Sequence, residues 1–233
     1  MTTRCARRCT GWATAGSDPA TRSPRTRSER KKRAVRWTLG FWLPLARVLF
    51  LDETDLLLFP PLRACWALQG AAPRQVLLTG RNARCVLFGA VDPLSGEVHL
   101  LARTAQRAED FCAFLRHLRR RHPRGPLVLV LDSDASHTAR ASQRLADELL
   151  ILLVFLPKRC PHLNPMDHLW RAAKGDVLAN HQYASLDDEL DRTASYLWSL
   201  SPQEVLTKAG ILSPTFWIRR LRANLCKNFL GLT

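Results

Sequence analysis

The sequence predicts an α/β fold in which helices flank a mixed β-sheet. Two continuous apolar runs, residues 127–131 and 149–156, are typical of strands that are buried on both faces of a sheet. Strand-like segments come first as a meander and later alternate with helical segments, an order typical of such a mixed sheet. With 233 residues, 46% of them hydrophobic, the chain can form one domain of ordinary size with extensions.

The first elements follow from local patterns. Residues 47–59, RVLFLDETDLLLF, are rich in bulky apolar residues and end at two prolines, which predicts a strand with a polar interruption. The turn sequence DPLSG at 92–96 separates two apolar runs within residues 84–104, which predicts a hairpin. Apolar side chains then recur at i, i+3, i+4 and i+7 of a helix that ends in arginines: Phe111, Phe114, Leu115 and Leu118.

Helices dominate the second half of the predicted fold. One around residues 138–149 connects the two apolar strands. The next begins at Asn164-Pro165, because asparagine is a favoured N-cap and proline has its φ set for the first helical turn. Its apolar stripe consists of Met166, Leu169, Trp170, Ala173 and Val177.

Two capping patterns predict helices beyond residue 180. Ser185 with Asp188 and Ser201 with Glu204 fit a capping box, the second reinforced by a proline at the first helical position. We therefore divide the chain into a basic arm (1–45), an α/β domain (46–180) and a helical C-terminal extension (181–233).

Most of the basic charge lies in the N-terminal arm. The chain carries +15, and residues 1–47 hold twelve Lys and Arg against two acids, so +10 lies there and +5 in the remaining 186 residues. Up to Ala34 the arm contains no Leu, Ile, Val or Phe, so we expect it to be disordered. Lys31, Lys32 and Arg33 belong to a basic run that either neutralises DNA phosphates or forms a solvated tail.

The cysteines and the hydropathy exclude several classes of protein. Seven cysteines, an odd number without a Cys-x-x-Cys pair, argue against a disulfide framework and a zinc ribbon and indicate a reducing, cytosolic setting. No apolar run approaches the length of a membrane span, and no apolar segment of a secretory signal follows the N-terminal charges. We therefore expect no membrane partner.

Three aspartates stand on the apolar elements: Asp52 in FLDETD, Asp132 after the strand VLVL, and Asp167 in the first turn of NPMDHLW. Groups at strand ends and helix starts converge on one edge of an α/β sheet, and converging carboxylates repel unless a cation compensates them. Carboxylates suit Mg²⁺ or Mn²⁺, and two such ions would clamp the attacking and leaving oxygens of a phosphodiester. The alternative is that each acid is a separate cap or turn residue, with Asp167 complementing only the helix dipole.

Several segments occur in the order of a known family: FLDETDL, Trp66 with Gly70, LVLDSDASH, LPKRCPHLNPMDHLW and KAGILSPTFW. With these segments the chain resembles bacterial insertion-sequence transposases of the Tc/mariner superfamily, the IS six-thirty type. The resemblance implies an RNase H-like DDE or DDD catalytic domain over 46–180. It also implies that Asp52, Asp132 and Asp167 bind two Mg²⁺ or Mn²⁺ ions in a bacterial, cytoplasmic, nucleoid-associated enzyme that cleaves DNA and transfers strands.

Two departures from the family pattern leave alternatives open. The third acid is Asp167 where many relatives have Glu, and a basic arm stands where helix-turn-helix domains usually read the transposon ends. Recognition of transposon ends and target DNA is then absent or supplied by a separate helix-turn-helix subunit, and a homodimer is a further expected partner. One alternative function is DNA binding or oligomerisation without cleavage, and another is a structure-specific nuclease.

Residues near the triad have competing interpretations. Because side chains alternate along a strand, we expect Glu53 to point away from Asp52 to the surface, and Asp134 to form a turn. His137 contacts the scissile phosphate or, by the better supported interpretation, bonds locally at a helix start. Arg171 and Lys174 share a helix face with Asp167. Either both contact DNA phosphate, or Arg171 forms an ion pair with Asp167. His117 and His122 lie on different faces of their helix, which argues against a zinc pair.

Overall fold

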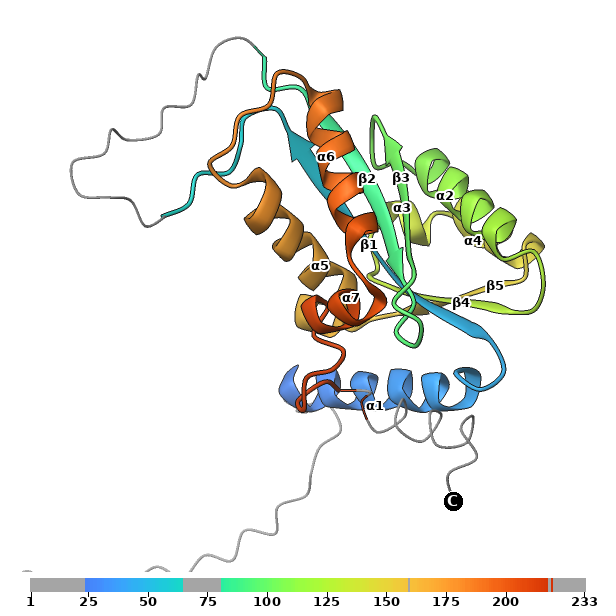
Figure 1. Ribbon diagram of the computed structural model, residues 1–233. Coiled ribbons are helices and arrows are strands. Elements are labelled where there is room, and N and C mark those ends of the chain that lie inside the picture. The colour runs from blue at the N-terminus through green and yellow to red at the C-terminus, as the bar shows by residue number, and fades with distance from the viewer. Residues whose placement is uncertain (1–23, 65–80, 159, 218, 220–233) are drawn as a thin grey trace, which may run out of the picture.

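A computed structural model describes residues 24–64, 81–158, 160–217 and 219 (Figure 1). The strands are β1 (Arg47–Leu57), β2 (Arg84–Val91), β3 (Val98–Arg103), β4 (Leu127–Leu131) and β5 (Ile151–Phe155). The helices are α1 (Pro24–Trp42), α2 (Ala108–Arg121), α3 (Ala135–Thr138), α4 (Arg140–Glu148), α5 (Pro165–Ala173), α6 (Leu186–Ser199) and α7 (Pro202–Lys208), with a 3-10 turn η2 (Pro161–Leu163) and a π-helical turn η3 (Lys174–Leu178).

The described strands form one five-stranded sheet in the order β3-β2-β1-β4-β5. β1, β2 and β3 are antiparallel neighbours, whereas β4 is parallel to both β1 and β5. The meander therefore forms one half of the sheet and the strands joined by helices form the other. This arrangement confirms the predicted mixed α/β fold and places β1 at the centre.

Helices cover both faces of the sheet (Figure 1). Val48 and Phe50 of β1 face the core that α1, α5, α6 and α7 share, whereas Leu49 and Leu51 face the core under α2 and α4. Each fully buried large apolar side chain of this kind contributes about 1.5–3 kcal/mol to the free energy of unfolding. Two-sided burial thus fixes the position of the central strand, and with it the position of Asp52.

The two apolar strands differ in burial. β4 is buried along its whole length, as predicted. β5 is an edge strand with Leu152 40% exposed, so the prediction of burial on both faces is wrong there. An apolar run has the same composition at the edge of a sheet as inside it, and only the strand order distinguishes the two cases.

Helix α1 corrects the prediction of a disordered arm. Residues 24–42 are helical, and Val35, Leu39 and Leu43 pack into the core at a helical spacing. Most helical stability in proteins comes from the packing of an apolar face. These three residues supply that face, although the first part of α1 contains no large apolar side chain. Residues 1–23 lie outside the described part of the chain.

The C-terminal helices begin as predicted. Ser201 and Glu204 form a reciprocal capping box, and the Ser185 hydroxyl accepts a hydrogen bond of 3.1 Å from the backbone N–H of Asp188. The apolar stripe of α5 ends differently, because η3 follows and adds a residue to the turn. As a result Leu178 is buried, and Val177, the predicted member of the stripe, is only half-buried. No helix of the described residues is long and apolar enough to cross a membrane.

Candidate active site

A cavity of about 430 Å³ lies where β1, β4 and the start of α5 meet. Asp52, Asp132 and Asp167 all line it, so the structure brings together three residues that are remote along the chain. The rest of its lining consists of Ser133, Asp134, Leu156, Pro157, Lys158, Cys160, Pro161 and Asn164. The predicted convergence of the three aspartates therefore corresponds to an open, polar pocket.

Asn164 ties the start of α5 to the central strand. Its Oδ1 accepts a hydrogen bond of 3.1 Å from the backbone N–H of Met166, which confirms the predicted N-cap. Its Nδ2 donates a second bond of 2.8 Å to the carbonyl of Leu51, the residue before Asp52. This buried side chain therefore sets the distance between the strand that carries Asp52 and the helix that carries Asp167.

Gly89 lets α5 approach the sheet closely. It pairs with Asp52 across β1 and β2, and a Cβ atom there would lie 2.6 Å from Cε of Met166 and also clash with the Trp170 ring. Only a residue without a side chain allows both groups to rest on the strand. The close packing brings the first turn of α5, with Asp167, toward Asp52.

The carboxyl group of Asp52 has a strongly raised pKa. Burial, followed by the negative charges of Glu53, Asp167 and Asp132, raises the pKa of Asp52 to about 8. Burial is the largest cause of this shift, and the neighbouring carboxylates add to it. A set of carboxylate oxygens with excess negative charge fits a hard divalent cation such as Mg²⁺ or Mn²⁺.

Glu53 corrects one of the predictions. Its side chain is 6% exposed, and Oε1 lies 2.8 Å from Nε2 of His137, so Glu53 is not a surface residue. Side chains do alternate along β1, but both faces of this central strand are covered. The residue that points away from Asp52 is therefore buried as well.

His137 links Glu53 to Asp132. Its ring is 1% exposed, and Nδ1 lies 3.0 Å from Oδ1 of Asp132, which confirms the predicted local bond. Burial alone lowers the pKa of His137, but the hydrogen bonds with Asp132 and Glu53 prevail and raise it to about 10. The bond with His137 in turn lowers the pKa of Asp132. Asp134, as predicted, forms a turn and caps α3 by accepting from the backbone N–H of Ser136.

The predicted DNA-binding cations lie in different settings. Arg171 forms an ion pair with Asp167, which was one of the two alternatives, and Lys174 is half-buried in η3. On α1, Lys32 pairs with Glu29 at 3.0 Å, while Lys31 and Arg33 are exposed. The cation that does line the cavity is Lys158, which the sequence analysis did not single out. Its position two residues after the apolar run that forms β5 could have indicated it.

A five-stranded mixed sheet with helices on both faces and an acidic cavity beside its central strands defines an RNase H-like α/β domain. The model of the DDE superfamily endonuclease family matches residues 47–190, which is more than half of the chain. The chain belongs to this family, and the predicted resemblance is confirmed.

The relatives agree with this assignment. An insertion element IS630 protein of Shigella sonnei is 27% identical over 157 residues, which are 66% of this chain and 46% of that protein. The chain thus spans about half the length of this bacterial relative.

Among solved structures, the Mos1 transposase paired-end complex with left transposon end has a TM-score of 0.62 at 19% identity, covering 94% of this chain and 66% of that one. A structure of the Mos1 transposase catalytic domain and Raltegravir with Mg has a TM-score of 0.58 at 17% identity, covering 87% and 96%. These structures share the fold with the present chain.

Proposed function

We propose that this chain is the catalytic domain of an insertion-sequence transposase, which cleaves DNA strands and joins them to a target. The observation that carries the proposal is that Asp52 of β1, Asp132 directly after β4 and Asp167 of α5 line one cavity. Asp134, which caps α3, lines the same cavity, so the proposal depends on the other three aspartates coming from separate segments of the chain. The pKa of Asp52, raised to about 8 first by burial and then by nearby carboxylates that include the other two, supports the proposal.

In this proposal the carboxylates of Asp52, Asp132 and Asp167 would hold two divalent cations, with Asp52 and Asp132 as the principal ligands. Mg²⁺ or Mn²⁺ bound there would supply charge for the attacking and leaving oxygens of a phosphodiester displacement. Magnesium appears in the description of the Mos1 catalytic-domain structure. The carboxylate oxygens of the present cavity suit the same ion.

Other residues of the chain would hold the aspartates and the DNA in place. His137 holds the Asp132 carboxylate through Oδ1, and Asn164 holds the start of α5 against β1. Lys158 is exposed at the rim of the cavity, where its ammonium group can bind a backbone phosphate. Transposon ends and target DNA are the proposed substrates, since the Mos1 relative is described in complex with a transposon end.

A nicking assay on supercoiled plasmid with Mg²⁺ or Mn²⁺ tests the proposal. We expect the wild-type chain to nick and Asp132→Asn to lose at least about a hundredfold in rate, because a ligand of the cations is lost. Asp55→Asn is the control, since Asp55 lies on β1 with Asp52 but does not line the cavity, is exposed and pairs with Arg84 at 2.8 Å. Nicking by Asp132→Asn at the wild-type rate would overturn the assignment.

The same assay distinguishes the cleaving enzyme from a second candidate function, which is DNA binding without cleavage. Exposed cations on α1 favour this candidate: Arg30, Lys31, Arg33 and Arg36. Plasmid binding in a gel-shift assay, without nicking by the wild-type chain, is the result that would support it. Hydrolysis without any strand joining would instead point to a nuclease of the same fold.

A further inference from the structure

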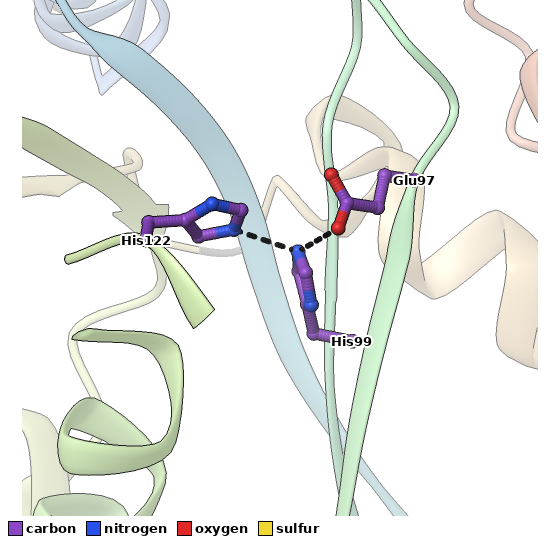
Figure 2. Close-up of side chains that lie close together, drawn as sticks. All are labelled: Glu97, His99 and His122. Carbon is purple, nitrogen blue, oxygen red and sulfur yellow. Dashed lines mark hydrogen bonds and ion pairs between the residues drawn. The ribbon is translucent and has the colours of Figure 1, made fainter. Parts of the chain in front are cut away.

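A second cluster of potential metal ligands lies at the opposite end of β4 from the acidic cavity. It consists of Glu97 in the turn before β3, His99 in β3, and His122 at the end of α2 (Figure 2). One ligand atom from each residue lies within 4.8 Å of the other two. His122 precedes β4 and Asp132 follows it, and none of the three cluster residues lines the acidic cavity.

The contacts within the cluster bring one potential ligand atom of each residue close to the other two. Nε2 of His99 lies 2.9 Å from Nε2 of His122 and 3.5 Å from Oε1 of Glu97. Figure 2 marks both contacts with dashed lines. In a tetrahedral zinc site with Zn–N bonds of about 2.05 Å, neighbouring ligand atoms lie about 3.3 Å apart. A shift of a few tenths of an ångström between the imidazoles would therefore open the space for an ion.

The surrounding residues hold the ligands in place. Arg47 donates to Oε2 of Glu97 at 2.6 Å, which leaves Oε1 turned toward the imidazoles. The turn that carries Glu97 is fixed by Oδ1 of Asp92, which accepts from the backbone N–H of Leu94 at 2.7 Å. His122 is the C-cap of α2, and its backbone N–H donates a hydrogen bond of 2.9 Å to the Leu118 carbonyl. The Glu97 carboxylate thus has an outer hydrogen-bond partner, as ligands of metal sites in proteins commonly do, and the other two bonds fix the backbone.

The protonation of the two histidines suits metal binding. His99 is 5% exposed, and burial lowers its pKa to about 4. Burial also lowers the pKa of His122, and Arg47 lowers it further. Both rings are therefore neutral near pH 7, and a neutral imidazole carries the lone pair that a metal ion requires. The simplest alternative is a hydrogen-bonded histidine pair with no ligand.

We propose that Glu97, His99 and His122 form a binding site for a first-row transition-metal ion, with zinc as the best fit and water as the fourth ligand. Two imidazoles and one carboxylate are a known donor set for zinc with an open position, whereas Mg²⁺ prefers oxygen ligands alone. The bound ion would fasten the β2–β3 hairpin to the end of α2. The chain would thus hold two kinds of cation, each selected by the chemistry of its ligands.

Metal titration of the full-length chain tests this site. Zinc binding is measured by calorimetry, and Co²⁺ is used as a spectroscopic substitute, in buffer with excess Mg²⁺ to occupy the carboxylate cavity. We expect the wild type to bind zinc, to unfold at a higher temperature when zinc is present, and to give the strong visible absorption of tetrahedral cobalt. Asp132→Asn should bind zinc as tightly as the wild type.

The variants separate a metal site from a histidine pair. His122→Ala and Glu97→Gln should each weaken zinc binding at least about tenfold and reduce the tetrahedral cobalt absorption. His117→Ala is the matched control, because His117 lies on the same helix but stacks on Phe114 and is not part of the cluster. Equal zinc affinity in His122→Ala and His117→Ala, or the absence of a tetrahedral cobalt spectrum in the wild type, would overturn the proposal.

Discussion

The Nε2 atom of His137 lies 2.8 Å from Oε1 of Glu53, a residue 84 positions earlier in the chain. The other ring nitrogen lies 3.0 Å from Oδ1 of Asp132, so one imidazole connects the central strand to the acid that follows β4. The side chains of Glu53 and His137 are buried and would be costly to bury without partners, whereas Asp132 is exposed. The connection fixes the direction of the Asp132 carboxylate relative to β1.

His137→Ala should therefore impair both stability and nicking. The buried Glu53 carboxylate would lose its partner, which costs about 3–5 kcal/mol in the free energy of unfolding. Nicking should fall at least about tenfold, with a higher Mn²⁺ concentration needed for half-maximal rate, because Asp132 is no longer held. Chemical denaturation and a Mn²⁺ titration of the nicking rate measure the two effects.

The double variant Glu53→Gln with His137→Gln is the control for stability alone. It removes both charges and retains polar groups of similar size, so much of the lost stability should return. If nicking also returned to the wild-type rate, His137 would have no role in positioning Asp132.

Asn164→Ala should separate α5 from β1. The change removes an N-cap, which costs about 1 kcal/mol, and leaves the buried Leu51 carbonyl without its bond, which costs about 1–3 kcal/mol more. We expect nicking to decrease because Asp167 moves relative to Asp52. Ser185→Ala removes a cap from α6 far along the chain and should cost about 1 kcal/mol while leaving nicking unchanged. Equal effects of the two variants on nicking would contradict the role of Asn164.

Gly89→Ala should displace α5 from the sheet. The added methyl group would overlap with Met166 and Trp170, and overpacking of this kind costs about 1–3 kcal/mol. The expected result is a lower free energy of unfolding together with reduced nicking. Gly175→Ala is the control, because its methyl group meets only the end of the flexible Arg63 side chain, at 3.3 Å. A wild-type nicking rate in Gly89→Ala would show that the close approach is not needed.

Glu189 should make the fold less stable as the pH rises. It is 3% exposed, its Oε1 has no hydrogen-bond partner among the described residues, and burial raises its pKa from 4.5 to about 7. Between these values the folded chain binds more protons than the unfolded chain, so the free energy of unfolding falls as the pH rises from 4.5 to about 7 and levels off above.

Glu189→Gln removes this dependence. We expect the variant to match the wild type near pH 4 and to be more stable near pH 8 by about 1–3 kcal/mol, since one pKa unit corresponds to about 1.4 kcal/mol. Denaturant unfolding at several pH values measures the difference. Parallel stability curves of the two proteins across this range would contradict the assignment.

Local patterns in the sequence predict the strands, the helix starts and the three acids, because these depend on periodicity, capping and turn chemistry. The side chain of Glu53 was placed wrongly because its burial depends on β1 being central, which no local pattern reveals. The exposure of β5 has the same origin. Helix α1 was missed because its apolar stripe begins only at Val35, after a long polar stretch. The second bond of Asn164, to the Leu51 carbonyl, spans 113 residues and follows only from the packing.

Asp52, Asp132 and Asp167 come to the cavity from three segments, and the last of these, α5, begins more than a hundred residues after β1 ends. While the chain is being synthesised on a ribosome, β1 emerges long before its parallel neighbour β4 and before the helix that carries Asp167. The three carboxylates therefore remain apart until most of the domain has left the ribosome. Incomplete chains consequently lack the assembled pocket.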